Sequence, residues 1–141
     1  MPATYQSIVV NAPVQKVWDT VKDFHDLSWA PNVISSCDAV GNHSGNEIGA
    51  KRVLNGVFKE TLVEVDTEVH KVRYSIDDGP SPVSASDVSN YYGTLQLRSS
   101  TLDGKTFVEW SSEWESSSEE AVEFCHQIYV ALLQALESNF K

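Results

Sequence analysis

The sequence predicts an α+β fold in which a curved antiparallel sheet of about seven strands wraps around a long C-terminal helix. Residues 5–10 read as a first strand. Between residues 33 and 115, apolar residues recur mainly with a period of two, in runs separated by turns such as Asn55-Gly56 and Asp103-Gly104. This spacing indicates about six further strands joined as a meander. From about residue 119 to residue 139 the apolar period becomes that of a helix.

Two short helical pieces are expected between the first strand and the meander. Asn11-Ala12-Pro13 supplies a cap and a first-turn proline, so a helix should begin there. The apolar residues that follow lie on one helical face: Val14, Val17, Trp18 and Val21. The second piece carries Phe24, Leu27 and Trp29 and ends at Pro31.

The last helix is expected to cover the apolar face of the sheet. Ser116 or Ser117 could close a capping box with Glu119 or Glu120 at its start. About 21 residues at 1.5 Å each reach roughly 31 Å, enough to cross the whole domain. Its apolar stripe consists of Cys125, Ile128, Tyr129, Leu132 and Leu136.

The charge and cysteine content argue against several classes of protein. Acidic residues outnumber basic ones by 20 to 10, a formal net charge of −10, and the basic residues are scattered. No basic stripe for a phosphate backbone is expected, so no nucleic-acid partner is predicted. Cys37 and Cys125 lie far apart, and neither they nor the four histidines have the spacing of a metal site. We expect two buried thiols and no metal.

A cytoplasmic location is the expectation from the remaining features of the chain. Residues 1–7 lack a basic region followed by an apolar run. No stretch reaches the roughly 18 consecutive apolar residues of a membrane-spanning helix, so membrane insertion is not expected. The sequence does not identify a protein partner.

Several short motifs occur along the chain together with this order of elements. They are Asn11-Ala12-Pro13-Val14, Ile48-Gly49-Ala50-Lys51-Arg52, Glu60-Thr61-Leu62, Tyr74-Ser75-Ile76, Gly79-Pro80, Tyr91 with Gly93-Thr94, and Trp110. In this order the chain resembles the START-like (SRPBCC) superfamily with the helix-grip fold, and within it the polyketide cyclase/dehydrase and lipid transport family. It is also similar to the lachrymatory factor synthases of onion and, more distantly, to the plant abscisic acid receptors.

The resemblance implies one START-like ligand-binding domain over residues 1–141. Its cavity, between sheet and long helix, would hold a lipid, a polyketide-like compound or another small hydrophobic or aromatic molecule, without a cofactor. Ser35 stands where the hormone receptors have a lysine for the ligand's carboxylate, and Pro80-Ser81-Pro82 replaces their latch. Recognition of abscisic acid is therefore not expected. The loop at residues 78–82 is either a gate or a stiff hairpin.

A charged pair is expected inside this apolar cavity. If Arg52 and Glu60 both face inward, each must satisfy the other, because burying either charge alone would cost several kcal/mol. The resemblance to the synthases implies that Arg52 orients a polar group, that Glu60 moves a proton, and that Tyr91 holds the substrate. These three are the candidate catalytic residues.

Two alternatives to this catalytic reading stay open. Arginine and glutamate on neighbouring strands also form ion pairs at the rim of a sheet. In addition, Thr61, Val63 and Val65 are the more apolar set of their strand, which would turn Glu60 outward unless a β-bulge resets the alternation.

The candidate ligand-binding residues are apolar or aromatic. They are Leu54, Phe58, Leu62, Tyr74, Tyr91, Trp110, Trp114, Ile128, Tyr129 and Leu132. Trp110 and Trp114 suit a flat ligand, although large aromatic side chains also fill the cores of small domains. The leading expectation is a binding domain for a small hydrophobic molecule. The alternative is a cofactor-free cyclase, dehydrase or isomerase.

Overall fold

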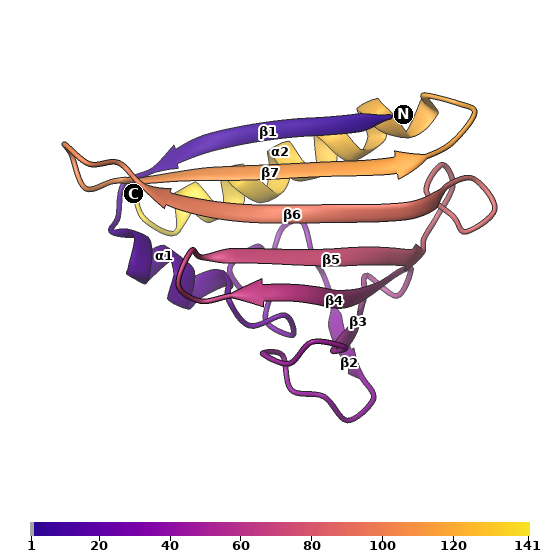
Figure 1. Ribbon diagram of the computed structural model, residues 1–141, viewed down its shortest axis with the longest axis horizontal. Helices are drawn as coiled ribbons and strands as arrows, with labels where there is room; N and C mark the ends of the chain where they lie inside the picture. Colours follow the sequence, from indigo (N-terminus) through magenta and orange to yellow (C-terminus); the bar gives the residue numbers. More distant parts are fainter. Residues whose placement is uncertain (1) are drawn as a thin grey trace.

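The computed structural model describes residues 2–141 as one seven-stranded antiparallel sheet with two helices (Figure 1). The strands are β1 (Ala3–Val10), β2 (Cys37–Val40), β3 (Lys51–Leu54), β4 (Phe58–Asp66), β5 (Lys71–Asp78), β6 (Ser89–Ser99) and β7 (Thr106–Glu115). The helices are α1 (Val14–Val21) and α2 (Glu120–Ser138). The predicted α+β class, the number of strands and the long C-terminal helix are confirmed.

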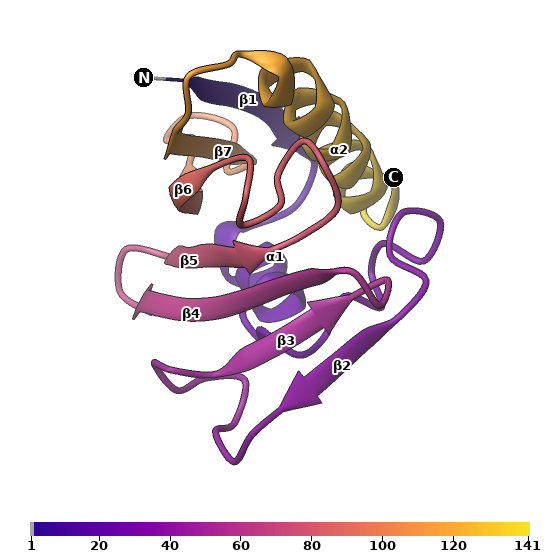
Figure 2. The ribbon, with the colours of Figure 1, turned by 90° about the vertical axis from the view of Figure 1, so that its right-hand side faces the viewer.

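The sheet is a meander whose last strand also pairs with the first. Its order is β1-β7-β6-β5-β4-β3-β2, with every pair antiparallel. The sheet curves from β1 round to β2, and α2 lies on its concave side (Figure 2). The inner face of the sheet and the buried stripe of α2 therefore enclose the core. The stripe comprises Ala121, Cys125, Tyr129, Leu132, Leu133 and Leu136.

The helix α2 begins without the predicted capping box. Its N-cap position is Glu119, whose side chain makes no capping hydrogen bond. Instead, the hydroxyl of Ser118 accepts a hydrogen bond from the backbone N–H of Glu120 at 3.1 Å. Ser116 is engaged elsewhere, because its hydroxyl donates to the carbonyl of Asp87 and accepts from the N–H of Ser118.

One helix, rather than the two predicted pieces, follows β1. The second piece is a run of turns within the connecting segment, residues 22–36. The carboxylate of Asp23 accepts the N–H of His25, and that of Asp26 accepts the N–H of Ser28, both at 2.9 Å. Such local side-chain bonds compete with the backbone pattern of a helix, which explains the difference. The apolar side chains predicted here are nevertheless buried: Phe24, Leu27 and Trp29.

A β-bulge in β4 decides which side chains of that strand face the core. Leu62 pairs with Tyr74 and Glu64 pairs with Arg73, which leaves Val63 without a partner in β5. Before the bulge, Glu60 and Leu62 are buried on the inner face, and after it the inward position passes to Val65. The bulge therefore reconciles an inward Glu60 with the apolar Val65 later in the strand.

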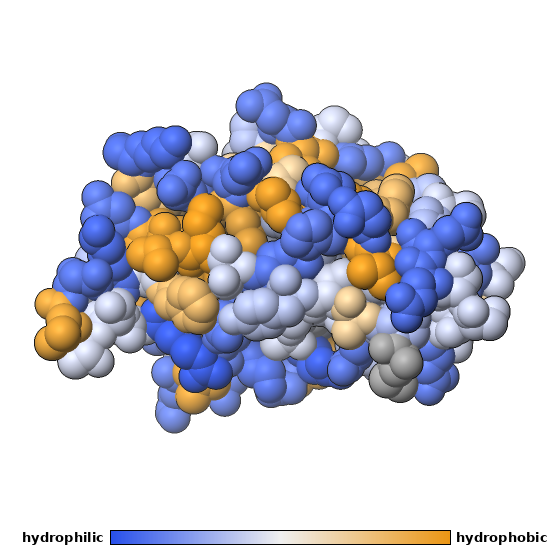
Figure 3. Space-filling model, turned by 90° about the horizontal axis from the view of Figure 1, so that it is seen from above, coloured by the Kyte–Doolittle hydropathy of each residue, from blue (hydrophilic) through white to orange (hydrophobic). Residues whose placement is uncertain are grey.

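The face of the molecule seen in Figure 3 is mainly hydrophilic. Seen from above, apolar side chains occur in small groups among hydrophilic ones (Figure 3). Within residues 2–141, no helix combines the length and the hydropathy needed to cross a membrane.

Candidate functional site

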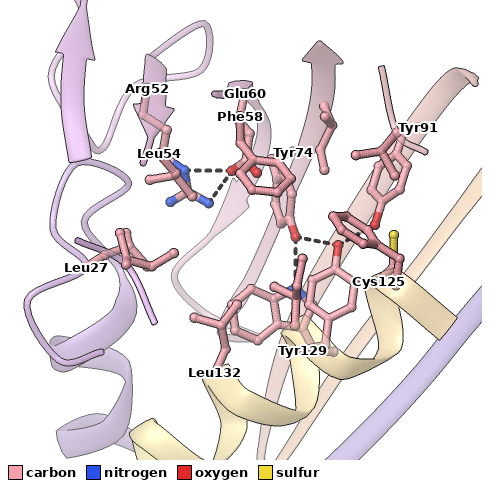
Figure 4. Close-up of a pocket in the computed structure, with 16 residues that line it drawn as sticks. Leu27, Arg52, Leu54, Phe58, Glu60, Tyr74, Tyr91, Cys125, Tyr129 and Leu132 are labelled. Atoms are coloured by element: carbon pink, nitrogen blue, oxygen red, sulfur yellow. Dashed lines mark hydrogen bonds and ion pairs between the residues drawn. The ribbon is translucent and has the colours of Figure 1, made fainter. Parts of the chain in front are cut away.

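A small cavity lies between the inner face of the sheet, the helix α2 and the connecting segment (Figure 4). Eight of the ten predicted ligand-binding residues line it: Leu54, Phe58, Tyr74, Tyr91, Trp110, Ile128, Tyr129 and Leu132. Both Arg52 and Glu60 also line it. The strands β3 to β7 and the helix thus bring together most of the predicted site.

The other two predicted residues lie outside the cavity lining. Trp114 is fully buried and stacks on Tyr91, with ring centroids 5.2 Å apart and an angle of 8° between the rings. Leu62 is also buried, next to Tyr74 across the β4–β5 ladder. Both side chains are therefore buried next to lining residues without lining the cavity themselves.

Six further lining residues were not predicted: Leu27, Ile34, Ile76, Val83, Phe124 and Cys125. Phe124 and Cys125 precede the predicted Ile128 and Tyr129 by four residues, so the helical period could have identified them. Leu27 comes from the connecting segment and Val83 from the loop between β5 and β6. No periodic signal in the sequence marks these loop residues.

Arg52 and Glu60 form a buried ion pair directly across β3 and β4. The two residues are partners in the ladder, and their exposures are 7% and 5%. Nε of Arg52 donates to Oε1 of Glu60 at 2.8 Å, and Nη2 lies 2.6 Å from the same oxygen. Nη1 donates to the carbonyl of Phe24 at 3.0 Å, and the guanidinium lies over the Phe24 ring at 3.8 Å. Through these two contacts with Phe24, Arg52 also anchors the connecting segment to β3.

The carboxyl group of Glu60 has one oxygen that is free of protein partners among the described residues. Both Arg52 contacts go to Oε1, and no hydrogen bond from residues 2–141 reaches Oε2. Burial raises the pKa of Glu60, while the nearby Arg52 opposes this rise. A buried carboxyl with an uncommitted oxygen beside a cavity is suited to accept a hydrogen bond or a proton from a ligand.

Three tyrosine hydroxyls form a second polar group on the lining (Figure 4). The hydroxyl of Tyr129 lies 2.9 Å from that of Tyr74 and 2.6 Å from that of Tyr91. The indole N–H of Trp110 donates to the hydroxyl of Tyr74 at 3.0 Å. Burial raises the pKa of all three tyrosines well above the ordinary value of 10.0, so each keeps its proton at neutral pH.

The cavity is small and its mouth is apolar. Its volume is about 40 Å³, which corresponds to two or three water molecules. Four of its lining side chains are only half-buried: Phe58, Ile76, Phe124 and Ile128. A ligand with a ring must displace some of them to enter.

A second cavity of about 20 Å³ lies beside the first. Four side chains line both: Leu27, Arg52, Tyr74 and Trp110. These side chains form a partition, so a shift of one of them would join the two spaces.

No group of three or more histidine, cysteine, aspartate or glutamate side chains in the described part of the chain is arranged to hold a metal ion.

The whole chain, and not the cavity alone, matches a known protein family. The model of the family described as polyketide cyclase / dehydrase and lipid transport matches residues 1–141. No curated protein matches the chain.

Several solved structures share the fold over nearly the whole chain. A protein from Nitrosospira multiformis is 48% identical, with a TM-score of 0.98, covering 99% of this chain and 97% of that one. The protein XoxI from Bacillus cereus is 28% identical, with a TM-score of 0.81 and coverages of 99% and 96%. A protein from Thermobifida fusca is 27% identical, with a TM-score of 0.82 and coverages of 99% and 93%.

Proposed function

Because the chain belongs to the polyketide cyclase/dehydrase and lipid transport family, we propose that it binds a small, largely apolar molecule in the cavity between the sheet and α2. Residues 1–141 would then act as one START-like ligand-binding domain. A cytoplasmic location stays a prediction.

The observation that carries this proposal is the composition of the lining. Apolar and aromatic side chains surround two polar groups, the Arg52–Glu60 pair and the three tyrosine hydroxyls. Ligand sites typically combine a mostly apolar wall with a few placed polar groups that orient the ligand. A core that served only for stability would gain little from a buried ion pair, because desolvation offsets much of its attraction.

Dye uptake and native mass spectrometry test the binding function. The purified protein should take up N-phenyl-1-naphthylamine, a neutral dye whose fluorescence rises in apolar surroundings. The Ile128→Trp variant, which fills the cavity mouth, should lose most of this uptake. Val130→Trp is the control, because Val130 is half-buried on the same helix but does not line the cavity.

Two results would count against the binding function. One is the absence of dye uptake together with the absence of a copurified apolar molecule in the mass spectrum. The other is equal uptake by both tryptophan variants.

Proton transfer is a second candidate function, favoured by the uncommitted oxygen of Glu60. In this function Glu60 would accept a proton from the carbon next to a ligand carbonyl. Arg52 would hold the other carboxylate oxygen, and Tyr91 would help to position the ligand. No cofactor is required for such a step.

Hydrogen–deuterium exchange on a simple ketone tests this candidate without knowledge of the natural substrate. The protein in D2O should accelerate exchange of the methyl protons of acetophenone, as followed by NMR. Glu60→Gln should abolish the acceleration and Glu113→Gln, on the outer surface, should not. If exchange is equally fast with Glu60→Gln, Glu60 is not the base.

A further inference from the structure

The cavity lining formed by residues 2–141 carries no net charge, because its one cation and its one anion form an ion pair. Arg52 is the cation of the lining and Glu60 the anion, and they are in direct contact. The remaining lining side chains are apolar, aromatic, or the thiol of Cys125. A ligand carboxylate would thus add an uncompensated negative charge to a space with little water, unless it separated Arg52 from Glu60.

One of the three tyrosine hydroxyl protons is not needed for the hydrogen bonds between the tyrosines. Tyr74, Tyr91 and Tyr129 carry three hydroxyl protons, and two contacts join their three oxygens. Each contact uses one proton, so one O–H remains for another acceptor whichever way the hydrogen bonds run. The indole of Trp110 donates to Tyr74 and therefore does not take this proton.

Cys125 does not remove the need for an acceptor. Its sulfur lies beside the hydroxyl of Tyr91 (Figure 4), but a thiol is a weak acceptor. The hydroxyl of Ser112 also lies near that of Tyr91, and it is already engaged with the hydroxyl of Thr4 at 2.6 Å. A carbonyl oxygen on a ligand would be a better partner for the remaining O–H, and a buried donor without a partner is costly. On the opposite side of the lining, Oε2 of Glu60 can accept a hydrogen bond from a ligand hydroxyl.

From these features we infer that the cavity selects neutral apolar molecules with a carbonyl oxygen, which accepts a hydrogen bond from the tyrosine cluster, and that it excludes carboxylates. This inference rests on the proposed binding function and specifies its ligand class. A hydroxyl group on the same ligand would add a contact to Glu60.

Three probes of similar size separate the possibilities: acetophenone, ethylbenzene and benzoate. Their affinities are measured by NMR titration at about pH 7.5, where benzoate is ionised. In a cavity without a donor, ethylbenzene should bind more tightly than acetophenone, because burying an unpaired carbonyl is unfavourable. With the tyrosine donor, acetophenone should bind at least as tightly as ethylbenzene, and benzoate at least about tenfold more weakly than acetophenone.

Two variants test the two polar groups separately. Replacing Tyr74, Tyr91 and Tyr129 together by phenylalanine should lower the acetophenone-to-ethylbenzene affinity ratio by about fivefold or more, the usual contribution of a net hydrogen bond. Tyr92→Phe is the control, since Tyr92 lies on the outer face of β6. Glu60→Gln should raise the affinity for benzoate relative to acetophenone, because it leaves the charge of Arg52 unmatched.

The results distinguish failure of the inference from failure of the proposed function. If none of the three probes binds, both the binding function and the inference are wrong. If acetophenone and ethylbenzene bind but benzoate binds equally well, only the inference is overturned. An affinity ratio unchanged by removal of all three hydroxyls would likewise overturn it. The wild-type comparison requires no variant, so it stays decisive if a variant fails to fold.

Discussion

Gly93 in β6 lies directly opposite Tyr74 in β5, and the Tyr74 phenol occupies the space that a side chain at position 93 would need. A Cβ atom built on Gly93 would lie 2.5 Å from the Tyr74 hydroxyl oxygen. The missing side chain thus allows Tyr74 to reach both Tyr129 and Trp110. A residue without a side chain therefore determines the position of the Tyr74 hydroxyl.

The first prediction follows from this contact. Gly93→Ala should lower the free energy of unfolding by about 1–3 kcal/mol, since overpacking forces the Tyr74 ring to move. Urea unfolding measures the loss, and a Gly93→Ala/Tyr74→Ala double variant provides the control. The alanine should cost clearly less in the Tyr74→Ala background. Equal costs in both backgrounds would show that the steric contact is not the cause.

The second prediction concerns the buried charge pair. Arg52→Met or Glu60→Leu alone should each lower stability by about 3–5 kcal/mol, because each leaves an unpaired buried charge. The double variant should be more stable than either single variant. The exposed pair Arg73–Glu113 is the control, and Glu113→Gln should change stability by less than about 1 kcal/mol. Additive losses in the urea-unfolding cycle would contradict a coupled pair.

The third prediction is a loss of stability at alkaline pH. Burial raises the pKa of Tyr74, Tyr91 and Tyr129, so the folded protein retains three protons that the unfolded chain releases near pH 10. Their contribution is fully present below that pH and is lost as the pH rises above it. The slope should approach about 4 kcal/mol per pH unit.

Urea unfolding between about pH 8 and about pH 11 measures this slope. The variant with all three tyrosines replaced by phenylalanine should show a much smaller slope, whereas Tyr92→Phe should behave like the wild type. Similar slopes for the triple variant and the wild type would assign the alkaline instability to other groups.

The fourth prediction concerns the mouth of the cavity. Phe124 is half-buried and lines the cavity, so Phe124→Ala should enlarge the entrance and raise the affinity for acetophenone severalfold. Stability should fall by about 1–3 kcal/mol, less than for a fully buried phenylalanine. Phe107→Ala, on the outer face of β7, should leave the affinity unchanged. NMR titration measures both affinities, and equal values would mean that the ring of Phe124 does not restrict entry.

Much of the fold could be predicted because its signals are local. The period-two runs and their turns define the meander, and the helical period from Cys125 to Leu136 defines the face of α2 that packs on the sheet. The second helical piece was predicted wrongly, because Asp23 and Asp26 bond to nearby backbone N–H groups and favour turns.

The sequence by itself determined the order of the elements, the apolar face of α2 and the presence of Arg52, Glu60 and three tyrosines within one predicted lining. It left the direction of Glu60 open, since the alternation of β4 alone favoured Val63 and Val65 as the inner set. The tertiary structure decided this point through the bulge at Val63, and it also decided that Leu62 and Trp114 are buried outside the cavity lining. The physical reason is that strand register, bulges and ring packing depend on partners distant in the chain, whereas periodicity and turn preference depend on near neighbours.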